Sequence, residues 1–424
     1  MCILNMSVVK NSLSLNNLIN WTLCFLPISF ILGSLLININ IMLVVLIGFL
    51  SIRAEKLKSN FDKIDAILLI FFIYYIFVTA LNINLVGEKI LIKAFLLIRF
   101  LGLYLVLKVL IENNKINLNN FFKVCLICTS FVSIDLLIQF FYGKDIFGIT
   151  PHEGRLTGVF GYEAIAGGYV QKLFLFSFLG LFYFLNNKDN KNIFILIFVM
   201  LHLNAVFVAS NRMNLILLVV TLILLSILFS KLRKVLILSL FVSYFSFSYL
   251  MSTSDQLKNH IRNIEKLSID IEKIGKDKNI SFFNHAHFKL YKAVIESYQR
   301  NIYFGNGLKS FRFNCVNVSN CSTHPHNYHL EVLHDTGIIG FTLLTLFILI
   351  KSINRIKTIL RVNRFNYNLK YFFAFPFINL LIELFPLKST GSLFGTWQGS
   401  LTWLILALAL YNMKKIKNSD ISKK

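Results

Sequence analysis

Apolar runs long enough to cross a lipid bilayer recur along almost the whole chain, with short polar segments between them. A transmembrane helix needs about 20 predominantly apolar residues, and the pattern predicts about twelve such helices. They lie near residues 19–36, 38–52, 64–82, 92–111, 121–142, 164–186, 192–209, 213–230, 234–251, 329–350, 371–386 and 394–412. The predicted fold is therefore all-α, a polytopic membrane protein in which residues 1–424 form a single integral membrane domain.

One long polar segment, residues 252–327, interrupts this pattern between the ninth and tenth predicted spans. Within it, residues 255–274 and 288–297 carry apolar side chains at helical spacing, which predicts short amphipathic helices lying over the bundle. Further along, Gly305-Asn306-Gly307 predicts a turn, because glycine and asparagine adopt a positive φ at little cost.

Basic residues in the short loops predict how the chain is oriented. The positive-inside rule places loops rich in lysine and arginine in the cytoplasm. Such loops alternate with the spans as that rule requires if both termini are cytoplasmic, which places the large loop 252–327 on the outer side. The residues concerned are Arg53, Lys56, Lys58, Lys63, Lys188, Lys191, Lys231, Arg233, Lys234, those between residues 351 and 370, and those of the C-terminal tail.

Composition agrees with this architecture. The chain is 56% hydrophobic and 15% charged, with a mean hydropathy of +0.67, which excludes an ordinary soluble globular protein. A formal net charge of +23 could indicate nucleic-acid binding. Because the basic residues fall mainly in short loops between apolar spans, we expect no nucleic-acid partner.

Six cysteines over the whole chain do not form a disulfide framework. Cys315 and Cys321 are the only two predicted on the outer side, where an oxidising compartment permits a disulfide between them. Two unrelated free thiols are the alternative. The first apolar run lacks an obvious cleavage site, so we expect it to stay in the membrane.

A cluster of titratable residues precedes the tenth span: His324, His326, His329 and His334, with Glu331 and Asp335 among them. Asn327 is suited to cap the helix that follows, which would hold His326 at the water-facing end of that helix. Gly337 and Gly340 would leave a smooth patch that a neighbouring helix or lipid can approach closely. Two other interpretations remain open: histidines that only anchor the membrane interface, and a zinc site built from His324, His326 and His329.

Charged residues within or beside the spans concentrate toward the outer leaflet. Arg99 and Asp135 lie at matching depth in adjacent antiparallel spans, which predicts an intramembrane ion pair. Lys172 lies in the sixth span, and Arg155 and Arg212 lie in outer loops. Guanidinium groups bind phosphate oxygens in a bidentate manner, so a basic outer half suits a lipid-linked diphosphate. Snorkelling or purely structural pairing is the alternative for Arg99 and Lys172.

The spacing of His326-Asn327, Gly337 and Gly340 resembles the signature of the O-antigen ligase and polymerase superfamily. These are membrane glycosyltransferases that use polyprenyl-diphosphate-linked glycans. The segments 155–161 (RLTGVFG) and 304–308 (FGNGL) resemble an outer-loop pattern and a glycine turn of the same superfamily. The resemblance covers most of the chain in topology, but its motifs cover only short segments.

The resemblance implies a role for several residues. His326 would take the proton from the acceptor hydroxyl. Arg212, in the short outer turn 208–213 (VASNRM), matches an arginine thought to hold the donor diphosphate, and Arg155 becomes a further phosphate ligand. Where the family often carries another arginine, this chain has His287 and Lys289, which leaves the second phosphate contact open. Arg99, Lys172 and Asn327 complete the predicted substrate-binding set.

The function that this resemblance implies is transfer of a glycan from undecaprenyl diphosphate to an acceptor sugar, the lipid A core, at the periplasmic face of a bacterial inner membrane. The reaction would invert the anomeric centre and need no metal and no cofactor. A polymerase of the same superfamily, which transfers to a growing glycan, is the alternative. A lipid-linked glycan transporter or flippase is a further one, which the absence of an evident internal repeat disfavours.

Overall fold

The computed structural model describes residues 14–57, 61–152, 155–185, 191–253, 286–298, 301–315, 322–362 and 367–411. Throughout these ranges the chain is helical apart from turns, connecting segments and an isolated bridge between His152 and Arg155. It divides into two compact units. The first comprises Met1–Leu26, Ser34–Asn117 and Phe282–Lys424, and the second comprises Pro27–Gly33 and Leu118–Ser281.

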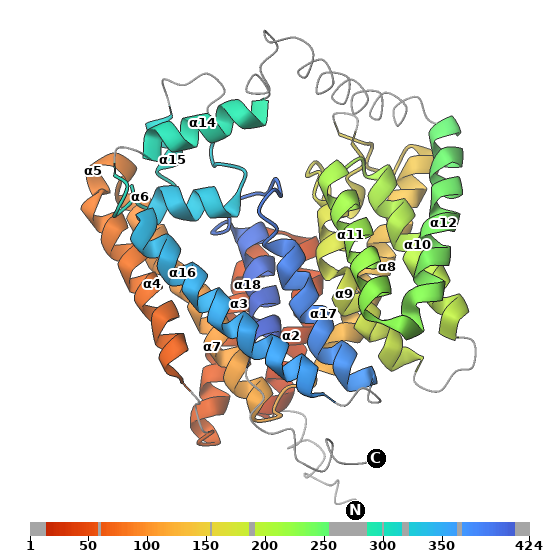
Figure 1. The fold of residues 1–424 in the computed structure, drawn as a ribbon, viewed down its shortest axis with the longest axis horizontal. Helices are drawn as coiled ribbons and strands as arrows, with labels where there is room; N and C mark the ends of the chain where they lie inside the picture. Colours follow the sequence, from red (N-terminus) through yellow and green to blue (C-terminus); the bar gives the residue numbers. More distant parts are fainter. Residues whose placement is uncertain are drawn as a thin grey trace, which may run out of the picture. The chain divides into compact units, whose positions relative to one another are not determined.

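The first unit contains the candidate catalytic histidine. Here α4 packs along α16, and α7 packs against α3 and α18 (Figure 1). Asp62 begins α4 by accepting hydrogen bonds from the N–H groups of Ile64 and Asp65, which satisfies donors that a helix start otherwise leaves unpaired. The helices of this unit are α2 (Leu15–Leu32, which ends in the second unit), α3 (Ser34–Ala54), α4 (Lys63–Leu81), α5 (Ile83–Val86), α6 (Glu88–Leu96), α7 (Ile98–Glu112), α14 (Ala286–Tyr298), α15 (Phe311–Asn314), α16 (Tyr328–Arg361), α17 (Tyr367–Glu383) and α18 (Thr396–Leu410).

A kink at Gly337 divides α16 into a short first part and a long second part, as the light-blue ribbon in Figure 1 shows. Gly337 has φ +64°, and a Cβ atom there would lie 2.2 Å from the carbonyl oxygen of Tyr303. Gly305 is equally confined, with its Cβ position 2.4 Å from the nitrogen of Gly337. Gly305 and Gly307 have positive φ as predicted, but the turns lie on either side of them, at residues 302–304 and 308–310. The segment fits against the kink because both contact positions lack a side chain.

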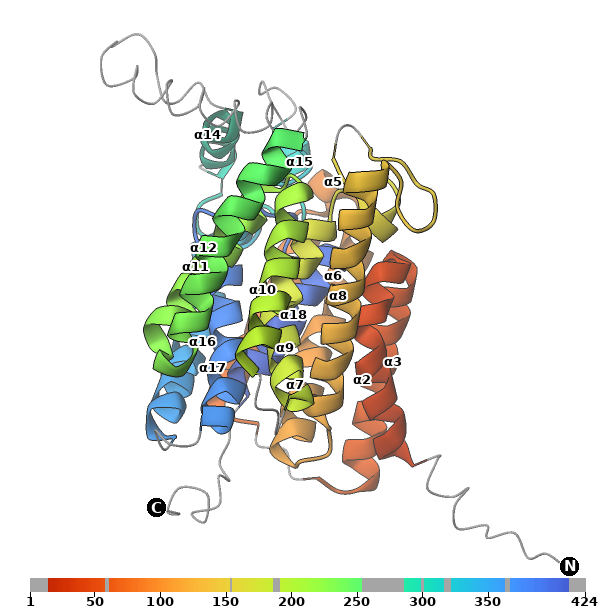
Figure 2. The ribbon, with the colours of Figure 1, turned by 90° about the vertical axis from the view of Figure 1, so that its right-hand side faces the viewer.

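The second unit packs α9 against α8 and α10, and α12 against α10 and α11 (Figure 2). Nearly every side chain in the first four turns of α9 is buried. Gly180 allows its close approach to α8, since a Cβ there would lie 2.2 Å from the carbonyl oxygen of Phe122. The elements of this unit are α8 (Leu118–Tyr142), the 3-10 helix η1 (Gly158–Phe160), α9 (Ala166–Phe184), α10 (Lys191–Val208), α11 (Arg212–Leu228) and α12 (Ser230–Thr253).

The predicted all-α, multi-pass membrane architecture is confirmed for the described residues. Eight of their helices are long and apolar enough to cross a membrane, and α11 and α18 are shorter apolar helices. Each of the predicted spans overlaps a helix, although the count of about twelve crossings, the orientation and the single membrane domain stay predictions. In the large loop, the helix predicted at residues 288–297 is confirmed as α14, whereas residues 255–274 lie outside the described ranges.

Candidate active site around His326

The backbone of His326 adopts a conformation that few side chains other than glycine accept. Its φ is +54°, in the left-handed region, and its carbonyl oxygen accepts a hydrogen bond from the N–H of Thr390 at 2.9 Å. Asn327 then begins α16 as predicted: its side-chain oxygen accepts from the N–H groups of His329 and Leu330. The histidine is thus held between a helix start and the loop before α18.

The imidazole of His326 is half-buried and lies beside two polar neighbours. Its Nε2 lies 3.2 Å from the hydroxyl oxygen of Ser322, and the ring centroid lies 4.1 Å from that of His324. Burial, followed by the proximity of His326, lowers the pKa of His324 to about 4, so this neighbour is neutral at pH 7. A neutral neighbour places no fixed positive charge against His326.

The loop between α17 and α18 forms one wall of this site. Glu331 is almost fully buried and accepts hydrogen bonds from the N–H of Leu393 and the hydroxyl of Ser392. The Nδ2 of Asn327 donates to the carbonyl oxygen of Pro386, and the Nε2 of His329 lies 2.9 Å from that of Leu384. Together with the bond from Thr390, these contacts join the loop to the first turns of α16.

A buried polar network fixes the same loop from within the bundle. The hydroxyl of Tyr328 donates to the Oε1 of Glu383 at 2.8 Å, and the ammonium of Lys388 pairs with Oε2 of the same carboxylate. The hydroxyl of Thr402 also donates to Oε1. Because a buried charge that loses its partner is costly, this ion pair ties the start of the loop firmly to α16 and α18.

Asp335 holds the segment after the glycine turn against α16. It accepts hydrogen bonds from the hydroxyl of Tyr75 at 2.6 Å and from the N–H of Lys309 at 2.8 Å. The Nδ1 of His334 lies 3.3 Å from the same carboxylate, and its ring meets Phe311 edge-on. The predicted histidine cluster therefore separates into the neighbours His324 and His326, with His329 and His334 turned to other partners.

Two basic residues that the sequence interpretation missed lie near His324. The guanidinium of Arg312 on α15 donates to the carbonyl oxygen of Thr323 at 3.2 Å. Burial, followed by the charge of Arg312, lowers the pKa of Lys309, and both cations act on His324. Their only signal in the sequence is that they follow the glycine turn at residues 304–308, where basic loop residues ordinarily need no explanation.

The arginines predicted to bind phosphate, Arg155 and Arg212, belong to the second unit. Arg212 is half-buried at the first position of α11, two residues after Ser210, whose φ is +56°. A cation is unfavourable at a helix N-terminus because the helix dipole is positive there, so Arg212 does not serve helix stability. Arg155 is exposed, and its backbone forms an isolated antiparallel bridge with that of His152. Lys172 is buried within α9.

The predicted pair of Arg99 and Asp135 would join the two units and stays a prediction. Within the first unit, Arg99 donates to the carbonyl oxygen of Leu96 and lies over the ring of Phe100, 4.6 Å from its centroid. Within the second unit, the Oδ1 of Asp135 accepts a hydrogen bond from the N–H of Ile146 at 2.9 Å. Each residue therefore has partners of its own.

Comparison with known families adds a finding. Residues 193–345 match the family model described as O-antigen ligase. This match supports membership of the O-antigen ligase superfamily. The matched region, about a third of the chain, contains both Arg212 and His326. No curated protein matches the chain.

Membership of this superfamily implies a lipid-linked glycan and a sugar acceptor in a membrane. Of the predicted substrate-binding residues, His287 and Lys289 lie on α14, where only their backbone is described. Cys315 is buried and disulfide-bonded, while its predicted partner Cys321 lies outside the described residues.

A zinc site in the histidine cluster requires His324, His326 and His329 to converge. Among the residues that the structure describes, no group of three or more His, Cys, Asp or Glu side chains could hold a metal ion. His329 differs from the other two histidines of that site, because its ring contacts the backbone of Leu384.

Proposed function

We propose that this protein transfers a glycan from undecaprenyl diphosphate to an acceptor sugar, the lipid A core, at the periplasmic face of a bacterial inner membrane. The observation that carries the proposal is the constrained position of His326 at the start of α16, within the region that matches the O-antigen ligase family. A strained backbone conformation at a non-glycine residue persists only where surrounding contacts enforce it, and such residues cluster at functional sites.

His326 acts as the general base in this proposal. Its imidazole takes the proton of the acceptor hydroxyl as that oxygen forms a bond to the anomeric carbon of the donor sugar. The bond between the anomeric carbon and the diphosphate breaks, and the diphosphate leaves with the electron pair. Attack opposite the leaving group inverts the anomeric centre. Ser322, with its hydroxyl beside Nε2, lies where it can orient the imidazole.

The departing diphosphate is stabilised by positive charge that is already in place. Arg212 is the principal ligand, because helix stability does not explain a cation at the first position of α11. Arg155, Lys172 and Arg99 contribute further positive charge, and His287 or Lys289 supplies the remaining phosphate contact. Asn327 has a positioning role, because its side-chain nitrogen and oxygen already make hydrogen bonds within the protein.

A transfer assay with purified lipid-linked donor and acceptor tests the proposal. His326→Ala should abolish transfer while membrane insertion and donor binding persist, because the base is lost and the phosphate ligands remain. Arg212→Ala should weaken donor binding as well. His329→Ala is the matched comparison and should be milder, since its ring faces Leu384. Near-normal transfer by His326→Ala at normal abundance would overturn the general-base role.

The choice between ligase and polymerase needs a cellular experiment. Deleting the gene and separating the surface glycans on a gel distinguishes the two activities. Long glycan chains that stay on the lipid carrier indicate a ligase. A single repeat unit attached to the core indicates a polymerase.

A further inference from the structure

The polar segment predicted at residues 252–327 contains an apolar turn, Ile302, Tyr303 and Phe304, which we call the tip. The three side chains are 38%, 67% and 50% exposed, whereas residues 305–308, which follow directly, are buried. Three consecutive large apolar side chains are unfavourable in water. The tip therefore needs an apolar environment outside the protein.

Every backbone carbonyl group of the tip is hydrogen-bonded within the first unit. The carbonyl oxygens of Ile302 and Tyr303 accept from the N–H groups of the two residues that follow the kink at Gly337, at 3.0 and 3.3 Å. That of Phe304 accepts from the hydroxyl of Tyr74 on α4 at 3.1 Å. Irregular backbone is tolerated at membrane depth only where the protein shields and satisfies its polar groups. The carbonyl groups of the tip meet this condition.

Tyr74 shows the level of the tip along α4. It lies seven residues before the end of this apolar helix, about 10 Å at the helical rise of about 1.5 Å per residue. The same face of α4 carries Ile70 one turn earlier, and Phe77 and Leu81 one and two turns later. All three are exposed. Because apolar residues are exposed on both sides of this level, the tip lies within the apolar band of α4 and not beyond its end.

The chain reaches the tip and returns from it on the same side of the kink in α16. It comes from α14, which packs beside Leu330 in the first part of α16. After the tip, the N–H of Asn306 donates to the carbonyl oxygen of His334, again before the kink. The N–H of Leu308 then donates to the hydroxyl of Thr79, five residues nearer to the end of α4 than the contact of the tip. This path is that of a re-entrant loop.

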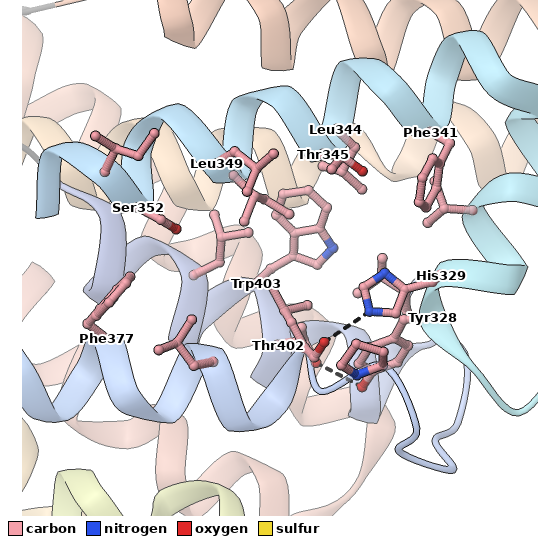
Figure 3. Close-up of a pocket in the computed structure, with 18 of the residues that line it drawn as sticks. Tyr328, His329, Phe341, Leu344, Thr345, Leu349, Ser352, Phe377, Thr402 and Trp403 are labelled. Carbon is pink, nitrogen blue, oxygen red and sulfur yellow. Dashed lines mark hydrogen bonds between the residues drawn. The ribbon is translucent and has the colours of Figure 1, made fainter. Parts of the chain in front are cut away.

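The tip does not open into the apolar cavity that lies along α16. That cavity has a volume of about 490 Å³, and Figure 3 shows Phe341, Leu344 and Leu349 projecting into it from the second part of α16. Neither the tip nor Ile338 and Ile339, which bind it, line this cavity, although both isoleucines are exposed. The tip and the start of the second part of α16 therefore form a separate apolar surface.

We propose that residues 302–304 insert among the lipids of the leaflet in which α4 ends. The side chains of the tip contact the acyl chains, and its carbonyl groups face their donors on α4 and α16. The hydroxyl of Tyr303 suits the boundary between acyl chains and headgroups, where tyrosine is enriched. The lipid contact thus lies at the kink that joins the two parts of α16. This proposal does not rest on the proposed function, because it requires neither a glycan donor nor an acceptor.

Tryptophan substitutions measure the environment of the tip. Tyr303→Trp places the probe in the tip, and Phe77→Trp on α4 is the reference within the apolar band. Tyr162→Trp, at an exposed tyrosine between α8 and α9, is the reference outside the helices. Each variant is reconstituted in phosphatidylcholine vesicles, and the fluorescence of the wild type with its three tryptophans is subtracted. Lipids brominated in the acyl chain quench a probe in contact with hydrocarbon, and acrylamide quenches a probe in water.

Brominated lipid should quench the added fluorescence of Tyr303→Trp as strongly as that of Phe77→Trp. Acrylamide should quench it much less than that of Tyr162→Trp. Quenching by acrylamide alone would overturn the proposal, because the tip would then lie in water. Weak quenching by both agents would also overturn it, since another protein surface would then cover the tip. Phe304→Trp repeats the measurement at the next position, so that a local distortion at residue 303 does not decide the result.

Discussion

The backbone N–H of Thr390 donates a hydrogen bond to the carbonyl oxygen of His326, 2.9 Å away. This bond joins the backbone of the candidate base to the loop between α17 and α18, which is remote from it in sequence. The left-handed backbone of His326 needs such external contacts, because its own local energy disfavours φ +54°. The orientation of the imidazole therefore depends on how firmly that loop is held.

Glu331 is the residue whose loss should loosen the loop most directly. Glu331→Ala removes the acceptor for the N–H of Leu393 and leaves that buried donor unpaired, at a cost of about 1–3 kcal/mol. We expect glycan transfer to fall about tenfold or more with His326 still present.

Two controls accompany this prediction. Glu331→Gln keeps an amide oxygen for Leu393 and should retain more activity than Glu331→Ala. Glu296→Ala on α14, where the carboxylate is exposed, should transfer glycan at the wild-type rate. Hydrogen exchange of residues 388–394 measures the loop itself. Unchanged exchange there in Glu331→Ala would refute the anchoring role.

The lowered pKa of His324 predicts a pH dependence of stability. Between the ordinary value of 6.5 and the folded value of about 4, the unfolded chain binds a proton that the folded protein does not. Stability should therefore fall as the pH drops through this window. His324→Phe removes the titrating group and should lessen the fall.

Melting temperatures of wild type and His324→Phe at pH 7.5 and pH 5 measure the effect. The comparison isolates one residue, because every other titrating group is common to both proteins. An identical drop in the two proteins would mean that His324 is not the neutral, buried group described here.

The helices could be predicted from the sequence because a helix that crosses a membrane needs a long run of apolar residues. Helix ends were harder. The tenth span was expected to end at residue 350, before Lys351, whereas α16 continues to Arg361. Lys351 is fully buried and pairs with Asp62 and Asp65, so a charge that suggested a loop is neutralised within the bundle.

The site could be predicted only in part. His326 and Asn327 stand in a recognisable spacing, and the capping role of Asn327 follows from local chemistry. The contact with Thr390 could not be foreseen, because it joins distant segments through backbone atoms that any residue carries. Lys309 and Arg312 were missed for a similar reason: only the folding of α15 beside Thr323 brings them near His324.

Asp65 is predicted to be essential for folding. Its carboxylate is fully buried on α4 and pairs with Lys108 and Lys351, and Tyr104 also donates to it. Asp65→Asn leaves two buried cations short of a partner, which should cost about 3–5 kcal/mol. Protein abundance and melting temperature should both fall sharply.

A second substitution distinguishes an electrostatic effect from a packing effect. Adding Lys351→Met to Asp65→Asn removes one unpaired cation and should restore part of the lost stability. Lys351→Met alone should also destabilise the protein. If the loss of stability in the double variant equals the sum of the losses in the two single variants, the ion-pair network is not the cause.

Gln139 is predicted to hold the loop that carries Arg155 in the second unit. Its side-chain oxygen accepts hydrogen bonds from the N–H groups of Thr157 and Gly158, both at 2.9 Å, and its amide donates to the carbonyl oxygen of Ile149. Gln139→Ala leaves the buried N–H groups of Thr157 and Gly158 without this acceptor. We expect trypsin to cleave after Arg155 several-fold faster, since opening of the loop precedes cleavage.

Gln171→Ala is the matched control for this loop. Gln171 is also a buried glutamine of the second unit, but it lies on α9 and has no part in these bonds. If both variants were cleaved after Arg155 at the same increased rate, general destabilisation would explain the result and the specific role of Gln139 would be refuted. Faster cleavage in Gln139→Ala alone, with weaker donor binding, would connect the loop to the phosphate ligand that it presents.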